Sequence, residues 1–148
     1  NVPELLERFN VIHLCGKGNV DSSLVELKGY KQFEYVTTEL SDLLYAADYV
    51  VSRAGSNSIF EFLALKKPML LIPLSASKSR GDQILNANIF KKQGFAEVLM
   101  EEELSKNSFM ESLRSLIAKK DSILQVMDEA EKPKTPDEMV KLILQYEK

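Results

Sequence analysis

The stretch SRAGSNSIFEF, residues 52–62, combines residue types that can bind a phosphorylated ligand. Gly55 permits a tight turn after an apolar run, and the next residues are Ser56, Asn57 and Ser58. A helix that begins here presents free backbone N–H groups and the positive end of its dipole, an arrangement that binds phosphate. We therefore predict an anion-binding helix start at these four residues.

Glu61 is the only charged side chain between Ala54 and Leu65, and it lies one turn after Ser58. A carboxylate repels phosphate, but it can accept two hydrogen bonds from the vicinal hydroxyls of a ribose. Together with a diphosphate at the helix start, this describes a nucleotide site. The alternative is a capping box, in which Ser58 caps the helix and Glu61 returns a hydrogen bond to the backbone. The pattern of this stretch alone leaves both interpretations open.

A second polar helix start follows the next apolar run, in SRGDQILNAN, residues 79–88. Asp82 is a candidate N-cap. Gln83 and Asn86 are three residues apart, so both amides lie on one side of a helix and can point into the same crevice. Two polar helix starts that face one crevice favour a ligand-binding role for Glu61.

The other reactive side chains carry weaker signals. His13 is the single histidine and lies in an apolar run, where we expect a buried, hydrogen-bonded structural residue. Cys15 is expected in the core. Gly16 begins a GKG turn that is too short for a phosphate-binding loop, although its amide could add a ligand contact. The sequence shows no cluster with metal-ligand spacing, and we expect no metal.

The composition narrows the class of protein. The 148 residues carry a net charge of −3, which gives no indication of nucleic-acid binding. A single cysteine excludes an internal disulfide and favours a reducing compartment. No apolar run approaches the roughly 20 residues that span a bilayer. The expected protein is therefore a soluble, cytoplasmic domain.

Short apolar runs alternate with helical patterns along the chain. Strands are expected at 11–15, 33–36, 48–52, 69–74 and 95–100. Helices are expected at 40–47, 56–67, 82–94, 107–119, 121–131 and 136–147. The alternation predicts an α/β fold with a Rossmann-like, doubly wound parallel sheet. Ligands bind beyond the carboxyl ends of the strands in such sheets, which is where both polar helix starts lie.

Three segments, SRAGSNSIFEFLALKKPMLLIPL, SRGDQILNAN and GFA, together resemble the C-terminal half of the MurG family of peptidoglycan glycosyltransferases in its Gram-positive form. The resemblance is densest over residues 50–98. It implies that residues 1–148 are the UDP-sugar-binding C-terminal domain of an inverting GT-B glycosyltransferase. Such enzymes transfer N-acetylglucosamine from UDP-GlcNAc to lipid I, the undecaprenyl-diphosphate-linked muramoyl pentapeptide, and so form lipid II.

The resemblance also implies roles for individual residues. Glu61 would bind the ribose hydroxyls, Gln83 would face the sugar, and Thr37 would hydrogen-bond uracil through its backbone. Asn86 would be a supporting polar residue, and Arg53 would brace the loop that precedes the first polar helix.

The resemblance also implies that two functional parts of the family, a diphosphate-binding loop and the catalytic base, lie outside this chain. Residues 56–58 would lie under the diphosphate and sugar, but the family's Gly-Gly-Ser loop, which contacts the same groups, would precede Asn1. The catalytic base belongs to the N-terminal half, so we assign no catalytic residue here. UDP-GlcNAc is a substrate, and no cofactor is expected.

The opening residues NVPELLERFN resemble a helix already under way, so we expect a fragment of a longer protein. Two other functions stay open, a UDP-GlcNAc 2-epimerase of the same fold and a nucleotide-sugar-binding subunit of a split glycosyltransferase. The lipid acceptor, bound through the missing N-terminal domain, would place the full-length enzyme peripherally on the inner face of the cell membrane.

Overall fold

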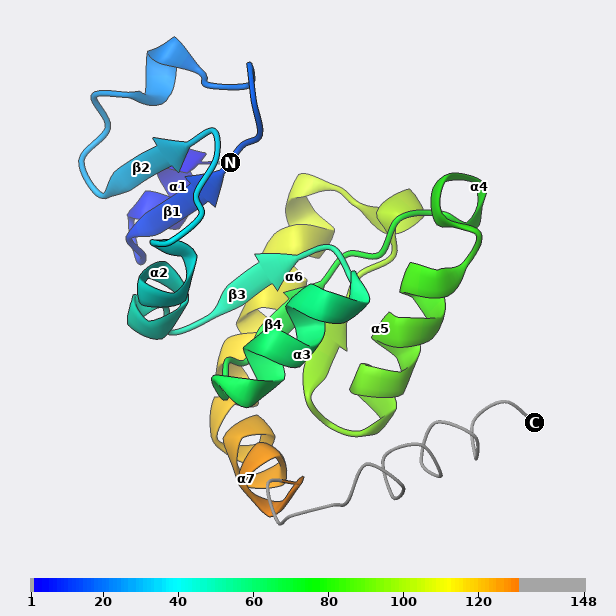
Figure 1. Cartoon of the computed structure of the whole chain (residues 1–148). Helices are drawn as coiled ribbons and strands as arrows, with labels where there is room; N and C mark the ends of the chain where they lie inside the picture. Colours follow the sequence, from blue (N-terminus) through cyan, green and yellow to red (C-terminus); the bar gives the residue numbers. More distant parts are fainter. Residues whose placement is uncertain (1, 131–148) are drawn as a thin grey trace. The chain divides into compact units, whose positions relative to one another are not determined.

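The computed structural model describes residues 2–130, and the predicted helix at 136–147 lies outside them. The chain divides into two compact units, Asn1–Ala46 and Ala47–Lys148 (Figure 1). None of the helices within the described range is long and apolar enough to cross a membrane. The strands within each unit are parallel, as the sequence predicted.

The first unit is built on a two-stranded sheet. Its elements are α1 (Val2–Leu6), β1 (Val11–Leu14), η1 (Ser22–Leu24), β2 (Tyr30–Phe33) and α2 (Leu40–Ala46). The predicted strand at 33–36 is wrong except for its first residue. Val11 pairs with Tyr30 and Leu14 with Phe33, so pairing ends at Phe33. Tyr30 is the buried residue of β2.

The second unit contains a three-stranded sheet in the order β3-β4-β5. Its strands are β3 (Val50–Ser52), β4 (Met69–Leu71) and β5 (Ala96–Val98). Its helices are α3 (Ser56–Ala64), α4 (Ala76–Ser79), α5 (Asp82–Lys92), η2 (Glu101–Glu103), α6 (Lys106–Ala118) and α7 (Lys120–Ala130). Because all three strands are parallel, their carboxyl ends lie at one edge of the sheet.

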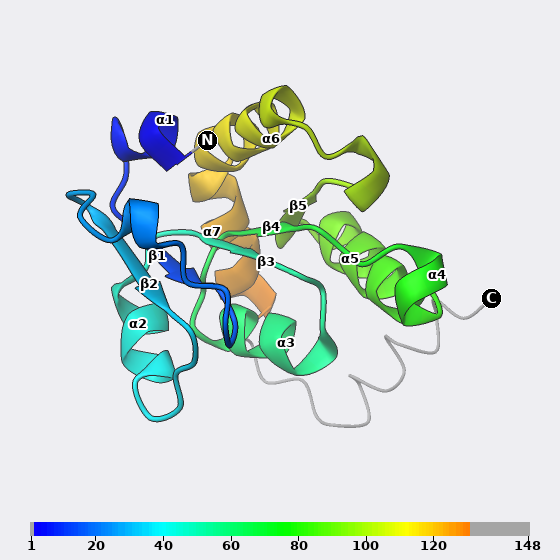
Figure 2. The same ribbon diagram turned by 90° about the horizontal axis from the view of Figure 1, so that it is seen from above.

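The middle strand, β4, forms the centre of the core. Met69, Leu70 and Leu71 have no exposed surface, because helices cover both faces of the sheet. Helices α3 and α5 lie on one face, and α6 lies on the opposite face (Figures 1 and 2). These elements explain the uncharged run that predicted a strand buried on both sides.

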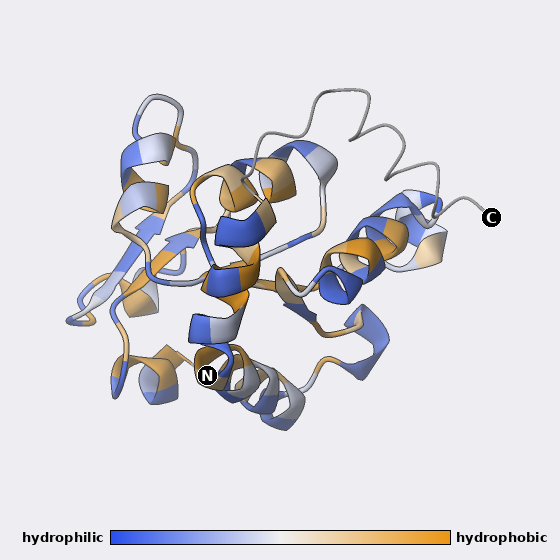
Figure 3. Cartoon of the chain, turned by 90° about the horizontal axis from the view of Figure 1, so that it is seen from below, coloured by the Kyte–Doolittle hydropathy of each residue, from blue (hydrophilic) through white to orange (hydrophobic). Residues whose placement is uncertain are grey.

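Helices α3, α6 and α7 of this unit are amphipathic. In α6, Met110, Leu113 and Leu116 are buried at helical spacing, and hydrophobic and hydrophilic residues alternate along the helical ribbons (Figure 3). Gly94, with φ of 82°, ends α5 as the sequence predicted. Helix α4 was not predicted, because its SASKS sequence has no apolar periodicity.

Candidate functional site

Helix α3 begins directly beyond the carboxyl end of β3. Its N-cap is Gly55, and its first intrahelical hydrogen bond joins the Ile59 N–H to the Gly55 carbonyl at 3.1 Å. The N–H groups of residues 56–58 therefore precede the helical ladder, and all three residues are exposed. This end of the helix can receive an anion.

Gly55 differs from the sequence-based expectation in one respect. Its φ of −67° and ψ of 135° are accessible to any residue, so the turn does not require glycine. The prediction that Gly55 supplies conformational freedom is therefore wrong. A Cβ added here would meet nothing within 4 Å. Gly55 instead leaves open space beside the exposed amides.

Glu61 lies on α3, one turn beyond the exposed amides, and is half-buried. The capping-box interpretation is wrong, because α3 begins at Ser56 and Ser58 is inside the helix rather than at its N-cap. The capping box in this structure instead joins Ser105 and Ser108 at the start of α6. Within residues 2–130, the Glu61 carboxylate makes no hydrogen bond or ion pair, so its oxygens can accept hydrogen bonds from a ligand.

Helix α5 directs two amide side chains at the loops that follow the strands. The side-chain oxygen of Gln83 accepts a hydrogen bond from the Leu74 N–H at 3.0 Å, and the side-chain nitrogen of Asn86 donates to the Ala54 carbonyl at 3.0 Å. Each amide therefore holds the backbone of a loop through one of its two polar atoms, the oxygen in Gln83 and the nitrogen in Asn86. Asp82 is the first helical residue and not the N-cap, which is Gly81 with φ of 83°.

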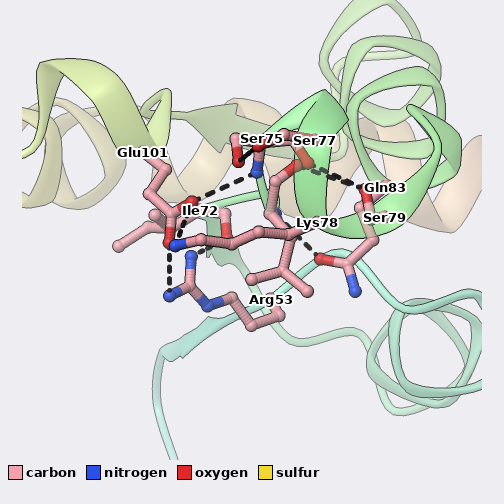
Figure 4. Close-up of polar contacts among 9 residues, drawn as sticks. Arg53, Ile72, Ser75, Ser77, Lys78, Ser79, Gln83 and Glu101 are labelled. Atoms are coloured by element: carbon pink, nitrogen blue, oxygen red, sulfur yellow. Dashed lines mark hydrogen bonds and ion pairs between the residues drawn. The ribbon is translucent and has the colours of Figure 1, made fainter.

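The Arg53 guanidinium contacts two segments outside its own loop. Its Nη1 donates to the Ile72 carbonyl at 3.2 Å, and its Nη2 pairs with Glu101 Oε1 at 3.0 Å. Glu101 Oε2 also accepts from the Ser75 N–H at 3.2 Å and pairs with Lys78 Nζ at 3.3 Å (Figure 4). One carboxylate thus contacts the loops that follow β3 and β4.

Glu101 is not among the site residues that the sequence predicted. It stands in the acidic run 101–103, which resembles a solvated turn. The one available signal was its position immediately after the predicted strand at 95–100. The Ser75 N–H is the main cause that lowers the pKa of Glu101, with further contributions from Lys78 and Arg53, while burial opposes them. Glu101 is therefore an anion at neutral pH.

Two predicted site residues, Thr37 and Gly16, belong to the first unit. Thr37 is exposed and follows β2; its carbonyl accepts the Leu40 N–H at 3.3 Å. The pKa of Glu39 is lowered by its own N–H and by that of Thr37. The backbone of Thr37 therefore already has intramolecular partners. Gly16 has φ of 84° and begins a turn in which its carbonyl accepts the Asn19 N–H at 3.1 Å.

The two remaining candidates are structural. His13 Nδ1 lies 2.7 Å from the Tyr30 hydroxyl, which confirms a hydrogen-bonded role, but His13 is exposed and not buried as predicted. Cys15 is half-buried rather than in the core, and its Sγ donates to the Phe33 carbonyl at 3.4 Å. In the part of the chain that the structure describes, no three His, Cys, Asp or Glu residues could together hold a metal ion.

Comparison with known proteins identifies the family of this chain. Residues 1–142 match the model of the glycosyltransferase family 28 C-terminal domain. A relative from Clostridium botulinum (strain Alaska E43 / Type E3), UDP-N-acetylglucosamine--N-acetylmuramyl-(pentapeptide) pyrophosphoryl-undecaprenol N-acetylglucosamine transferase, is 55% identical over 97% of this chain. A protein of the same name from Geobacillus thermodenitrificans (strain NG80-2) is 59% identical over 88% of the chain. The chain spans 40% of the first relative and 36% of the second.

Solved structures support the fold. The glycotransferase of kitacinnamycin superposes on 80% of this chain with a TM-score of 0.66 at 20% identity, the match covering 29% of that protein. Glycosyltransferase VinC in complex with DTDP superposes on 79% of the chain and 29% of its own, with a TM-score of 0.55 at 20% identity. The predicted Rossmann-like α/β half of a GT-B glycosyltransferase is thereby confirmed. From the family model and the two relatives, the chain belongs to the glycosyltransferase family 28 C-terminal domain family.

Proposed function

We propose that this chain is the donor-binding part of an inverting glycosyltransferase that moves N-acetylglucosamine from UDP-GlcNAc to an undecaprenyl-diphosphate-linked muramoyl pentapeptide. The observation that carries the proposal is the start of α3, where three exposed residues precede the helical ladder beside the open space at Gly55. The names of the two relatives supply the donor and acceptor, and they favour a transferase over a 2-epimerase.

The donor would lie with its diphosphate against residues 56–58 and its ribose at Glu61. The distance along α3 suits this arrangement, because Glu61 follows Ser58 by three residues and so lies about one turn deeper. The oxygen of the Gln83 amide binds the Leu74 N–H, and its Nε2 would face the sugar (Figure 4).

The reaction in this proposal needs little from the chain beyond charge stabilisation. The acceptor hydroxyl oxygen attacks the anomeric carbon, and the bond from that carbon to the diphosphate oxygen breaks with its electron pair leaving on UDP. The acceptor proton passes to a base in the rest of the protein. The N–H groups of residues 56–58 stabilise the charge that develops on the leaving diphosphate, because they are already aligned before the reaction.

The acceptor carries a lipid, so the whole enzyme would work at the cytoplasmic face of the cell membrane. The surface that contacts lipid would belong to the remainder of the protein, since the relatives are more than twice as long as this chain. Neither a cofactor nor a metal enters this proposal.

The experiment that tests the proposal compares two ligands and two proteins. UDP and its 2′,3′-dideoxy analogue are titrated into the chain and into Glu61→Ala, with the amides of residues 56–61 followed by NMR. We expect Glu61→Ala to weaken UDP binding about tenfold to a hundredfold, because hydrogen bonds to a charged group contribute roughly 1.5–3 kcal/mol. The dideoxy analogue lacks the diol, so both proteins should bind it equally weakly.

Two results would contradict the proposal. One is a Glu61→Ala protein that binds UDP as well as the unmodified chain. The other is equal weakening for both ligands, which would mean that the substitution disturbs α3 and that the carboxylate does not bind ribose. Urea unfolding of the variant, measured in parallel, shows whether the substitution disturbs α3 and so identifies the second case.

A further inference from the structure

Glu101 connects three loops that are far apart in the sequence. It stands at the start of η2, just beyond β5, and only 17% of its side chain is exposed. Its Oε1 pairs with Arg53, which lies in the loop after β3. Its Oε2 accepts a hydrogen bond from the Ser75 N–H and pairs with Lys78, both in the segment that follows β4. This carboxylate therefore joins the carboxyl ends of all three strands of the sheet (Figure 4).

Arg53 strengthens the connection because it is held at two points. Its guanidinium donates to the Ile72 carbonyl at 3.2 Å while it pairs with Glu101 at 3.0 Å. A planar guanidinium held by two acceptors has little rotational freedom. Arg53 is thereby committed to bracing and is not a free cation for a ligand.

The segment 74–79 depends on side chains from outside it. Its first two N–H groups are bound by Gln83 at Leu74 and by Glu101 at Ser75. Helix α4 has only four residues and cannot hold its own position, since so short a helix is unstable without tertiary contacts. The position of this segment therefore depends on the carboxylate of Glu101.

We propose that Glu101 is a positioning residue for the sugar end of the donor site, an inference that rests on the proposed function. Gln83, the residue expected to face the sugar, is hydrogen-bonded to Leu74, and Leu74 is adjacent to the N–H that Glu101 holds. Loss of the carboxylate frees the segment 74–79 and, with it, the amide of Gln83. The start of α3 is held by contacts that do not involve Glu101, namely Asn86 at the Ala54 carbonyl and Arg53 at the Ile72 carbonyl, so UDP binding is preserved.

The experiment measures the affinities of UDP and UDP-GlcNAc for three variants of the chain by NMR titration. Glu101→Ala should lower the UDP-GlcNAc affinity roughly fivefold while the UDP affinity changes less than about twofold, the size expected when one or two hydrogen bonds are lost. Glu101→Gln retains an oxygen for the Ser75 N–H but not the charge, so its UDP-GlcNAc affinity should fall roughly twofold. Amide exchange at Ser75 should accelerate in Glu101→Ala without any ligand.

Glu97→Ala is the matched control. Glu97 lies on β5 with 16% of its side chain exposed and pairs with Lys119 Nζ at 2.6 Å, but it is not at the carboxyl edge of the sheet. Its loss should lower stability and leave the ratio of the two affinities unchanged. A purely structural role for Glu101 would give the same result as Glu97.

The outcomes separate the inference from the function it rests on. If the unmodified chain binds both nucleotides and Glu101→Ala leaves their affinity ratio unchanged, the positioning role is wrong and the proposed function stands. If the unmodified chain binds neither nucleotide, the proposed function is wrong and the positioning role falls with it. A ratio that shifts in Glu101→Ala but not in Glu97→Ala supports both.

Discussion

Gly55 and Gly81 are both N-cap residues of helices at the candidate site, and they differ in backbone conformation. Gly55 has φ of −67°, whereas Gly81 has φ of 83°. An added Cβ would meet nothing within 4 Å at either position. Alanine substitutions here therefore separate backbone strain from steric contact, because only Gly81 occupies a conformation that alanine resists.

We expect Gly81→Ala to lower the free energy of unfolding by about 1–2 kcal/mol, the cost of a left-handed conformation for a residue with a Cβ. Gly55→Ala should change it by less than about 0.5 kcal/mol, because the weaker N-cap is offset by a less flexible unfolded chain. Urea unfolding of both variants measures the difference. Equal losses would show that the two turns are under similar strain.

Gly55→Ala is expected to affect ligand binding instead of stability. Its methyl group would enter the open space beside the amides of residues 56–58, where the proposed diphosphate lies. UDP affinity should fall about tenfold, which corresponds to roughly 1.4 kcal/mol. Calorimetry or NMR titration measures it, and Gly81→Ala serves as the control. Unchanged UDP binding in Gly55→Ala would place the diphosphate elsewhere.

At the level of the elements, the site depends on how the loops after three parallel strands are held together. Asn86 ties α5 to the loop after β3 through the Ala54 carbonyl, and Glu101 ties the loop after β5 to the other two. Side chains therefore hold the loops at the edge of the sheet together, whereas β4 forms the centre of the core.

The contacts of Glu101 make this edge sensitive to acid. Its pKa lies below the ordinary value of 4.5, chiefly because of the Ser75 N–H, so the unfolded chain binds the proton more readily than the folded one. The contribution to stability is fully present above pH 4.5 and is lost as the pH falls through the lowered value. The unmodified chain should therefore exceed Glu101→Gln in stability at neutral pH.

Urea unfolding of the two proteins at about pH 7, 4 and 3 measures this difference. Subtraction of the Glu101→Gln values removes the contributions of Asp21 and Glu39, whose pKa values are also lowered by hydrogen bonds. We expect the difference between the proteins to shrink as the pH falls. A difference that is constant with pH would mean that the charge of Glu101 does not stabilise the fold.

At the level of the whole molecule, we expect this chain to bind nucleotide but to transfer nothing. It spans 40% of the Clostridium botulinum relative, and the acceptor in our proposal is bound by the rest of such a protein. Holding two reactants in place can contribute roughly 7–11 kcal/mol to a two-substrate reaction. No described residue is assigned to hold the acceptor.

Incubation of the chain with UDP-GlcNAc and a lipid I analogue should give no product above background. A chimera in which this chain replaces the matching segment of the Clostridium botulinum relative should give product, because the two sequences are 55% identical there. Turnover by the chain alone would show that it is a self-sufficient enzyme of another kind. A chimera that folds, binds UDP-GlcNAc and stays inactive would count against the proposed transferase.

Much of the fold could be predicted from local sequence. The uncharged run at β4 predicted a strand buried on both faces, and the helical patterns at 82–94 and 107–119 placed α5 and α6 within two residues of their observed ends. Gly94 predicted the end of α5. These features succeed because helix periodicity, strand burial and glycine conformation depend on neighbouring residues.

The remaining features depend on contacts between distant segments. The register of β2 is decided by pairing with β1, and the N-cap of α3 by the path of the chain out of β3. Gln83 and Asn86 were expected to point into one crevice, but only the folded chain shows that each is bound to a loop backbone.

Glu101 is the clearest case of a residue whose role the tertiary structure decides. In the sequence it is one of three consecutive glutamates, and only its place directly after the predicted strand at 95–100 distinguishes it from its neighbours. In the structure it accepts a hydrogen bond from Ser75, 26 residues away, and pairs with Arg53. Residue types and spacing predicted a helix from Ser56, because helix preference depends on neighbouring residues, whereas phosphate binding at that start stays a prediction. Which side chains hold the surrounding loops is set only when parallel strands bring their carboxyl ends to one edge.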